Sequence, residues 1–159
     1  MRKIRLVASL LFGLVLFNSC SNDDDTADVV AEVQLEDVMV QNSPWTFSHY
    51  ELINVVNAGT SAMTPAEIES DMNLQLAGFT LIFNQDGTGE TAIEGEESES
   101  WTWVIENEDN LRIVYAGNFS DEYFNLSLLN SQLKMEAESV THDSAANLEV
   151  LHYGSLVFE

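Results

Sequence analysis

Basic residues are scarce in this chain. Lys and Arg number 5 against 27 Asp and Glu, so the formal net charge of the 159 residues is −22. Contacts with the phosphates of nucleic acids or with anionic lipid headgroups need several Lys or Arg side chains in one place. The composition therefore excludes a nucleic-acid-binding protein. The acidic residues are scattered, not set at the spacing of metal ligands, so we interpret their charge as a source of solubility in a crowded or salty medium and not as a cation store.

Cysteine and long apolar runs are also lacking. Cys20 is the only cysteine, so no disulfide can form within the chain and the fold must be held by packing alone. The apolar run over residues 6–17 is shorter than the roughly 20 residues that a membrane-spanning helix requires. Its length instead suits the apolar core of a secretory signal peptide.

The first twenty residues have the other features of an export signal as well. Arg2, Lys3 and Arg5 precede the apolar run, and the small residue Ser19 stands immediately before Cys20. An acidic stretch follows the cysteine. The arrangement resembles the signal peptides of bacterial lipoproteins, in particular those of the Bacteroidota. This resemblance implies lipid attachment at Cys20 and a location at the outer membrane or cell surface; the alternative is an ordinary cleaved signal peptide that leaves an unused cysteine.

Cleavage before that cysteine would divide the chain into three parts. Residues 1–19 form the signal peptide, residues 20–42 an acidic tether without aromatic side chains, and residues 43–159 a single folded domain. The apolar spacing between residues 29 and 40 also suits a short helix, although we favour a flexible spacer there because the segment begins with a run of acidic residues.

From residue 45 onward, apolar and polar side chains alternate with a period of two, which is typical of strands with one buried face. The clearest runs are Trp45-Phe47-His49, Phe79-Leu81-Phe83, Trp101-Trp103-Ile105 and Leu111-Ile113-Tyr115. Further runs lie at residues 90–93, 123–129, 133–138 and 148–158. The pattern predicts eight strands, and the short polar links between successive strands indicate antiparallel neighbours.

One segment departs from this period. Thr64, Pro65 and Glu67 match a capping box with proline at the first helical position, which predicts a helix over residues 64–76. Eight antiparallel strands leave two unpaired edges unless the sheet closes on itself. We therefore expect an all-β fold, an eight-stranded antiparallel up-and-down barrel with one short helix inserted after the first strand.

Several of these strands share a family pattern. An aromatic strand ends in Asp86-Gly87-Thr88, and a Trp-rich strand, Trp101-Thr102-Trp103, precedes Leu111-Arg112-Ile113. Over residues 43–159 the chain resembles the lipocalin-like lipoproteins of the Bacteroidota, which implies a lipocalin-like barrel. The Asp-Gly pair by itself predicts a hairpin turn, because glycine accepts a positive φ, and its surroundings lack the oxygen ligands of a calcium loop.

Large apolar side chains occupy the predicted inner face of this barrel. The candidates for the barrel interior or the lining of a ligand site are Trp45, Phe47, Phe79, Leu81, Phe83, Trp101 and Trp103. An eight-stranded barrel is either filled by its side chains or just wide enough for one small ligand. The sequence leaves both arrangements open, although the size of these residues favours a mostly filled interior.

The histidines give little indication of chemistry. His49, His142 and His152 do not have the spacing of metal ligands, so we expect neither a metal site nor a cofactor. The consecutive His142, Asp143 and Ser144 include the residue types of a hydrolytic triad, but neighbours in sequence cannot adopt the relay geometry.

Two kinds of surface site are further candidates. The acidic residues at 94–99 predict a solvated hairpin tip, with a weak calcium site as the alternative. Asp25-Thr26-Ala27 and Asp143-Ser144-Ala145 resemble the motif at which the Bacteroidota O-glycosylate exported proteins, which makes Thr26 and Ser144 candidates for modification.

The function expected from these observations is binding and not catalysis, because the sequence has no recognisable nucleophile–base pair, metal set or phosphate loop. We expect a lipid-anchored barrel, without a cofactor, that binds a small apolar or amphipathic ligand and contacts the membrane through Cys20. The competing interpretation is a solid barrel that contacts a surface protein or a glycan. A connected interior of roughly 300 Å³ or more would favour the ligand-binding interpretation.

Overall fold

The structure, a computed structural model, describes residues 34–93 and 95–159. The predicted signal peptide over 1–19, the lipidation site Cys20 and the glycosylation candidate Thr26 lie outside these residues. Among the described residues, neither helix has the length and apolar character needed to cross a membrane.

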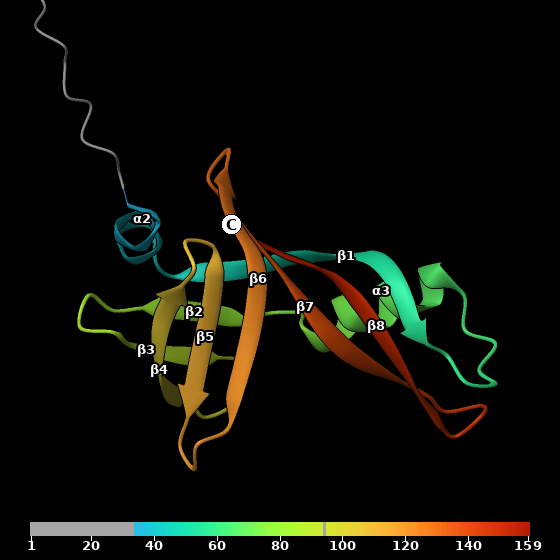
Figure 1. The fold of residues 1–159 in the computed structure, drawn as a ribbon. Helices are drawn as coiled ribbons and strands as arrows, with labels where there is room; N and C mark the ends of the chain where they lie inside the picture. The colour runs from blue at the N-terminus through green and yellow to red at the C-terminus, as the bar shows by residue number, and fades with distance from the viewer. Residues whose placement is uncertain (1–33, 94) are drawn as a thin grey trace, which may run out of the picture. The chain divides into compact units, whose positions relative to one another are not determined.

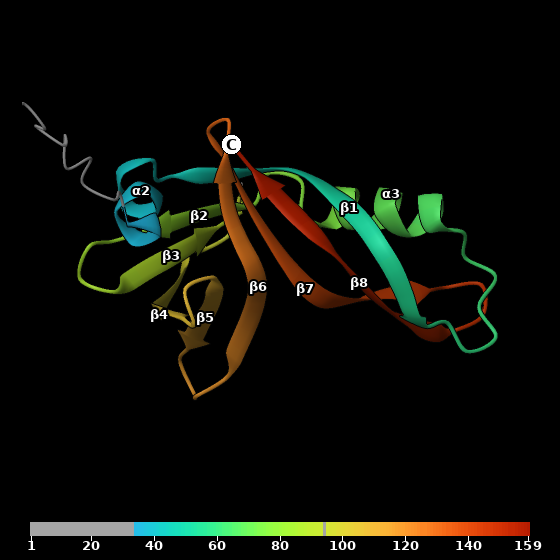
Figure 2. The ribbon, with the colours of Figure 1, turned by 45° about the horizontal axis from the view of Figure 1, so that its top comes forward.

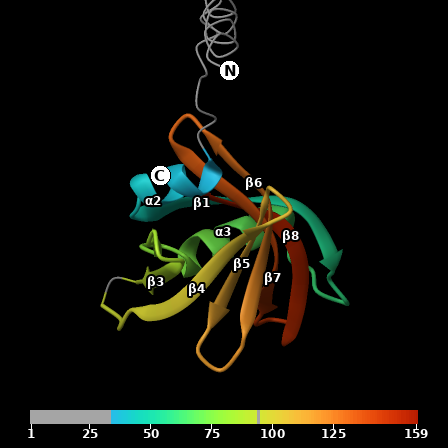
Figure 3. The same ribbon diagram turned by 60° about the vertical axis from the view of Figure 1, so that its left-hand side comes forward.

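Eight antiparallel strands form a closed barrel in which neighbours follow chain order and the last strand pairs with the first (Figure 1). The strands are β1 (Trp45–Asn57), β2 (Thr80–Phe83), β3 (Thr88–Ala92), β4 (Glu99–Glu106), β5 (Asn110–Tyr115), β6 (Ser120–Leu129), β7 (Gln132–Asp143) and β8 (Leu148–Phe158). Figure 3 shows this wall from another side, with β4, β5, β7 and β8 visible together. The predicted fold class is confirmed.

The helix after the first strand is also confirmed. It is α3 (Pro65–Gln75), and both halves of its predicted capping box are present. The Thr64 backbone N–H donates to Glu67 Oε2 at 2.7 Å, and the Glu67 N–H donates to Thr64 Oγ1 at 3.4 Å. These bonds satisfy donors that the first turn of a helix leaves without a partner.

α3 covers the edge of β1 that faces away from β8. The backbone N–H groups of Tyr50 and Leu52, two residues apart, donate to Asn73 Oδ1 at 2.8 Å and to Glu69 Oε1 at 2.9 Å. Alternate residues of a strand are separated by about 6.7 Å, close to the rise of about 6 Å between helix residues i and i+4. The side chains of α3 therefore take the place of a neighbouring strand, and Figure 2 shows the helix running alongside β1.

β1 changes its partner near its beginning. Trp45 pairs with Leu81 of β2, whereas the strand from Phe47 to its end pairs with β8. A register shift between Phe47 and His49 also changes which face is buried, so that Tyr50 is buried and His49 is only half-buried. The predicted alternation of Trp45, Phe47 and His49 on one inner face is therefore wrong at His49, because a shift of one residue moves side chains to the opposite face.

A second helix lies where a tether was predicted. It is α2 (Leu35–Gln41), and its Met39 is completely buried. The Met39 carbonyl accepts a hydrogen bond of 2.8 Å from the indole N–H of Trp45, which fixes the end of the helix to β1. The prediction that the tether extends to residue 42 is therefore wrong for its last part, which belongs to the folded domain; residues 20–33 lie outside the described part.

Candidate ligand pocket between β6 and β7

One part of the barrel interior is solid. Phe83 is 2% exposed and packs edge-on against Trp101 at a centroid distance of 5.3 Å and against Trp103 at 5.2 Å. Trp45, Phe47, Leu81 and Trp101 are buried in the same cluster, whereas Trp103 is partly buried. Six of the seven predicted interior residues thus fill the barrel on the side of β1 to β4.

The opposite side of the barrel opens where β6 and β7 diverge. Residues 120–123 of β6 pair with β5, and β6 pairs with β7 only from Phe124 onward. β7 pairs with β6 as far as Glu136 and continues beside β8 to its end. Figures 1 and 2 both show the two strands meeting at one end and spreading apart at the other.

The divergence begins at Asn125. This residue has a left-handed φ of 51° and lies within the register shift of β6. Its side-chain amide donates a hydrogen bond of 2.7 Å to Oε2 of Glu136 on the neighbouring strand β7. Asparagine is among the residues that most readily adopt this conformation. Asn125 therefore holds a bulge that turns the first half of β6 away from β7.

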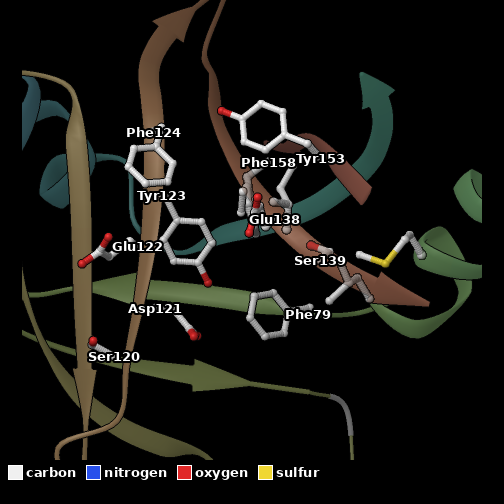
Figure 4. A pocket seen from close by; sticks show the side chains of 14 residues that line it. Phe79, Ser120, Asp121, Glu122, Tyr123, Phe124, Glu138, Ser139, Tyr153 and Phe158 are labelled. Carbon is white, nitrogen blue, oxygen red and sulfur yellow. The ribbon is translucent and has the colours of Figure 1, made fainter. Parts of the chain in front are cut away.

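A pocket of about 840 Å³ occupies the resulting gap (Figure 4). We call it the β6–β7 pocket. Its lining is contributed by the end of α3 and the segment after it, by β6, and by β7 and β8: Met72, Leu76, Phe79, Ser120, Asp121, Glu122, Tyr123, Phe124, Ala137, Glu138, Ser139, Tyr153, Leu156 and Phe158. Among the residues predicted for the barrel interior or a ligand lining, Phe79 lines this pocket, whereas the other six belong to the packed side of the barrel.

The inner wall combines apolar side chains with three polar ones. Asp121 and Tyr123 lie opposite the buried Ile113 and Leu111 of β5, so their side chains share the inner face of the barrel. Ser139 lies two residues after the buried Ala137 and therefore also points inward, as Figure 4 shows. The remaining lining residues of these strands, Ser120, Glu122, Phe124 and Glu138, alternate with the inward-facing ones and border the opening.

Burial controls the ionisation of the tyrosines near this wall. It raises the pKa of Tyr123, and the negative charge of Asp121 raises it further. The pKa of Tyr115 on β5 is raised by burial first, then by Tyr123 and Asp121. Both phenols therefore stay neutral at ordinary pH and keep their O–H groups as hydrogen-bond donors.

His152 is a buried polar group that the sequence reasoning missed. It is 0% exposed, with Nδ1 2.7 Å from the Tyr50 hydroxyl and Nε2 3.0 Å from the Thr141 hydroxyl. A neutral imidazole satisfies both contacts in either tautomer, since each hydroxyl can donate or accept. Nothing in the sequence distinguishes this histidine from the exposed His142, because its burial depends on partners in two other strands, β1 and β7.

His152 gives the domain a predictable pH dependence. Burial lowers its pKa, whereas the charge of Asp71 opposes this effect. The unfolded chain therefore binds a proton at His152 before the folded chain does as the pH falls. This contribution to stability is complete above the ordinary pKa of about 6.5 and is lost as the pH falls through that value towards the folded pKa.

We expect the melting temperature to decrease from about pH 8 to about pH 5.5, above the range in which most carboxylates titrate. The decrease should be reduced in His152→Gln and retained in His142→Gln, which changes an exposed histidine. Thermal unfolding followed by circular dichroism measures both. An equal pH dependence in His152→Gln and the unsubstituted chain would contradict this assignment.

The loop after β7 is held as a turn by the side chain of Asp143. Asp143 Oδ2 accepts a hydrogen bond of 2.6 Å from the Ser61 hydroxyl, and Oδ1 accepts the backbone N–H of Ala145 at 2.9 Å. Ser144 is exposed, as the glycosylation hypothesis requires. For the acidic hairpin, no group of three potential ligands is placed to hold a metal ion within the described residues, which exclude Glu94.

Comparison of the chain with protein-family models, curated protein sequences and solved structures finds no match. The function of the β6–β7 pocket therefore has to be argued from its own geometry.

Proposed function

We propose that this chain is a cell-envelope lipoprotein, lipocalin-like in its barrel, that binds a small apolar or amphipathic molecule in the β6–β7 pocket without transforming it. The observation that carries the proposal is the pocket of about 840 Å³ inside an eight-stranded barrel. Pockets for small molecules have volumes of about 300–1,000 Å³, mostly apolar walls and a few polar groups.

The wall chemistry supports binding. Leu76, Phe79 and Leu156 supply apolar surface, and Asp121 and Ser139 supply polar groups that can orient a ligand. The nearby tyrosines, whose pKa values are raised, act as neutral donors and not as bases. This combination suits a reversible carrier.

The competing function, a solid barrel that contacts a surface protein or a glycan, requires a filled interior. The packing of Phe83 against Trp101 and Trp103 supports such filling for one side of the barrel only. The volume between β6 and β7 favours the carrier.

Attachment to the outer membrane or cell surface is the part of the proposal that rests on sequence. The lone Cys20 follows an export signal and precedes an acidic stretch. A lipid at this position would hold the domain at the membrane, which makes the membrane a partner through the anchor.

Mass spectrometry of the protein purified from its own host tests both parts of the proposal. We expect an added mass that survives denaturation and maps to Cys20, and a second added mass, present in the native protein and lost on denaturation. An unmodified Cys20 would overturn the anchor. A native mass equal to the denatured mass, with no uptake of apolar probes by the same sample, would contradict the proposal that the pocket binds a small molecule.

A further inference from the structure

We infer that the ligand of the β6–β7 pocket is an organic cation, an ammonium group attached to an apolar body. The inference rests on the proposed function and specifies the class of ligand. It starts from Asp121, whose carboxylate lies on the inner wall together with the aromatic rings of Phe79 and Tyr123 (Figure 4).

An acidic group at the opening, Glu138, extends this negative charge. Glu138 of β7 borders the gap on the side opposite β6, whereas Glu122 lies on the other face of β6, opposite Arg112 of β5. The cavity thus has an apolar end formed by α3 and β8 and an acidic side formed by β6. An amphipathic cation fits this division, because its apolar body and its charge contact different walls.

The basic residues of the described barrel are engaged elsewhere. Lys134 Nζ lies 2.6 Å from Glu51 Oε2, and Arg112 pairs with Glu106. None of these four residues lines the pocket. Within the described part of the chain, Asp121 therefore has no cationic side chain to neutralise it, and a ligand can supply the missing charge.

Asp121 also discriminates against other ligands. It is exposed to solvent, so its charge is hydrated. A neutral ligand that covers it removes this hydration without replacing it, and an anionic ligand adds repulsion. An ammonium group replaces the lost water with an ion pair, and the rings of Tyr123 and Phe79 add cation–π attraction.

Three probes with the same apolar body separate these contributions: octylammonium, octan-1-ol and octanoate. We would titrate each into residues 20–159 carrying Cys20→Ser and follow the ¹³C-labelled methyl group of Met72, which lines the pocket. Octylammonium is expected to bind at least about tenfold more tightly than octan-1-ol, and octanoate more weakly than either.

Asp121→Asn keeps the shape of the side chain and removes its charge. We expect it to bring the affinity for octylammonium to within about threefold of that for octan-1-ol, because it weakens octylammonium binding and also removes the hydration penalty that octan-1-ol meets at the carboxylate. Glu149→Gln is the matched control, because it removes one negative charge from an exposed β8 residue that does not line the pocket.

The outcomes distinguish this inference from the proposed function. Binding of octan-1-ol with equal or weaker binding of octylammonium would contradict the inference of a cationic ligand, but would still support the proposal that the pocket binds a small molecule. Equal weakening of octylammonium binding by Asp121→Asn and Glu149→Gln would also overturn the cation, because the attraction would then come from the net charge of the chain. Failure of all three probes would overturn the carrier as well.

Discussion

Phe83→Ala is expected to lower the free energy of unfolding by about 3–5 kcal/mol. Phe83 is 2% exposed and is enclosed by the rings of Trp101 and Trp103. Truncation removes a large buried apolar surface and leaves a cavity that the rigid indoles cannot close. Urea denaturation of the variant and the unsubstituted chain measures the difference, and a loss below about 1 kcal/mol would contradict the tight packing of this cluster.

The same residue tests the division of the barrel into a solid side and a hollow side. Phe83→Leu, a milder change suited to binding measurements, should leave the affinity for octan-1-ol unchanged. Phe79→Leu alters a partly buried ring of the pocket lining and should weaken octan-1-ol binding by about threefold to tenfold, with a smaller loss of stability than Phe83→Ala. Weaker octan-1-ol binding in Phe83→Leu, with unchanged binding in Phe79→Leu, would place the ligand beside Trp101 and Trp103 instead.

Gly154→Ala is expected to lower the free energy of unfolding by about 3 kcal/mol. A Cβ atom at this buried position of β8 would overlap the phenol of Tyr50 and lie 2.6 Å from the backbone oxygen of Glu51. Tyr50 would have to move, and its hydrogen bond with His152 would be lost. Chemical denaturation measures the effect.

A double-mutant cycle with Tyr50→Leu separates the phenol clash from the backbone clash. The double variant should lose at least about 1 kcal/mol less stability than the sum of the two single losses, because leucine gives space to the new methyl group. Additive effects would show that Gly154 is required by the Glu51 backbone alone, and a neutral Gly154→Ala would contradict the close approach of Tyr50.

The strands and α3 could be predicted because their signals are local. Leu111 and Ile113 alternate with half-buried residues as the period of two requires, and the capping box at Thr64 is formed as its sequence indicates. Closure of eight strands then follows from the need to pair the sheet edges. These features depend on residues close together in the chain.

The pocket could not be predicted because it depends on where strands change partners. The shift at Phe47 buries Tyr50 instead of His49, and the bulge at Asn125 separates β6 from β7. Asparagine is compatible with a left-handed φ but does not require it, so neither event has a distinctive sequence. The large aromatics gave the position of the core, whereas the pocket lies where Asp121 and Ser139 interrupt the apolar wall.

A short helix near α2 was the less favoured alternative, and its packing against the barrel and the burial of His152 were missed for a related reason. Met39 is buried because Trp45 packs and hydrogen-bonds beneath the helix end, a contact between two elements. His152 is satisfied by hydroxyl groups of β1 and β7, which are distant in sequence. Such pairings appear only when the strands have been placed in register.

The central claim, that the gap between β6 and β7 binds a ligand inside the barrel, is tested most directly by filling the gap. Ser139→Trp places an indole in the pocket, and Ser127→Trp places the same side chain on an exposed position of β6 outside it. Binding of octan-1-ol, followed at the Met72 methyl group, should be lost in Ser139→Trp and retained in Ser127→Trp, with both variants folded. Undiminished binding in folded Ser139→Trp would place the ligand elsewhere and contradict the claim.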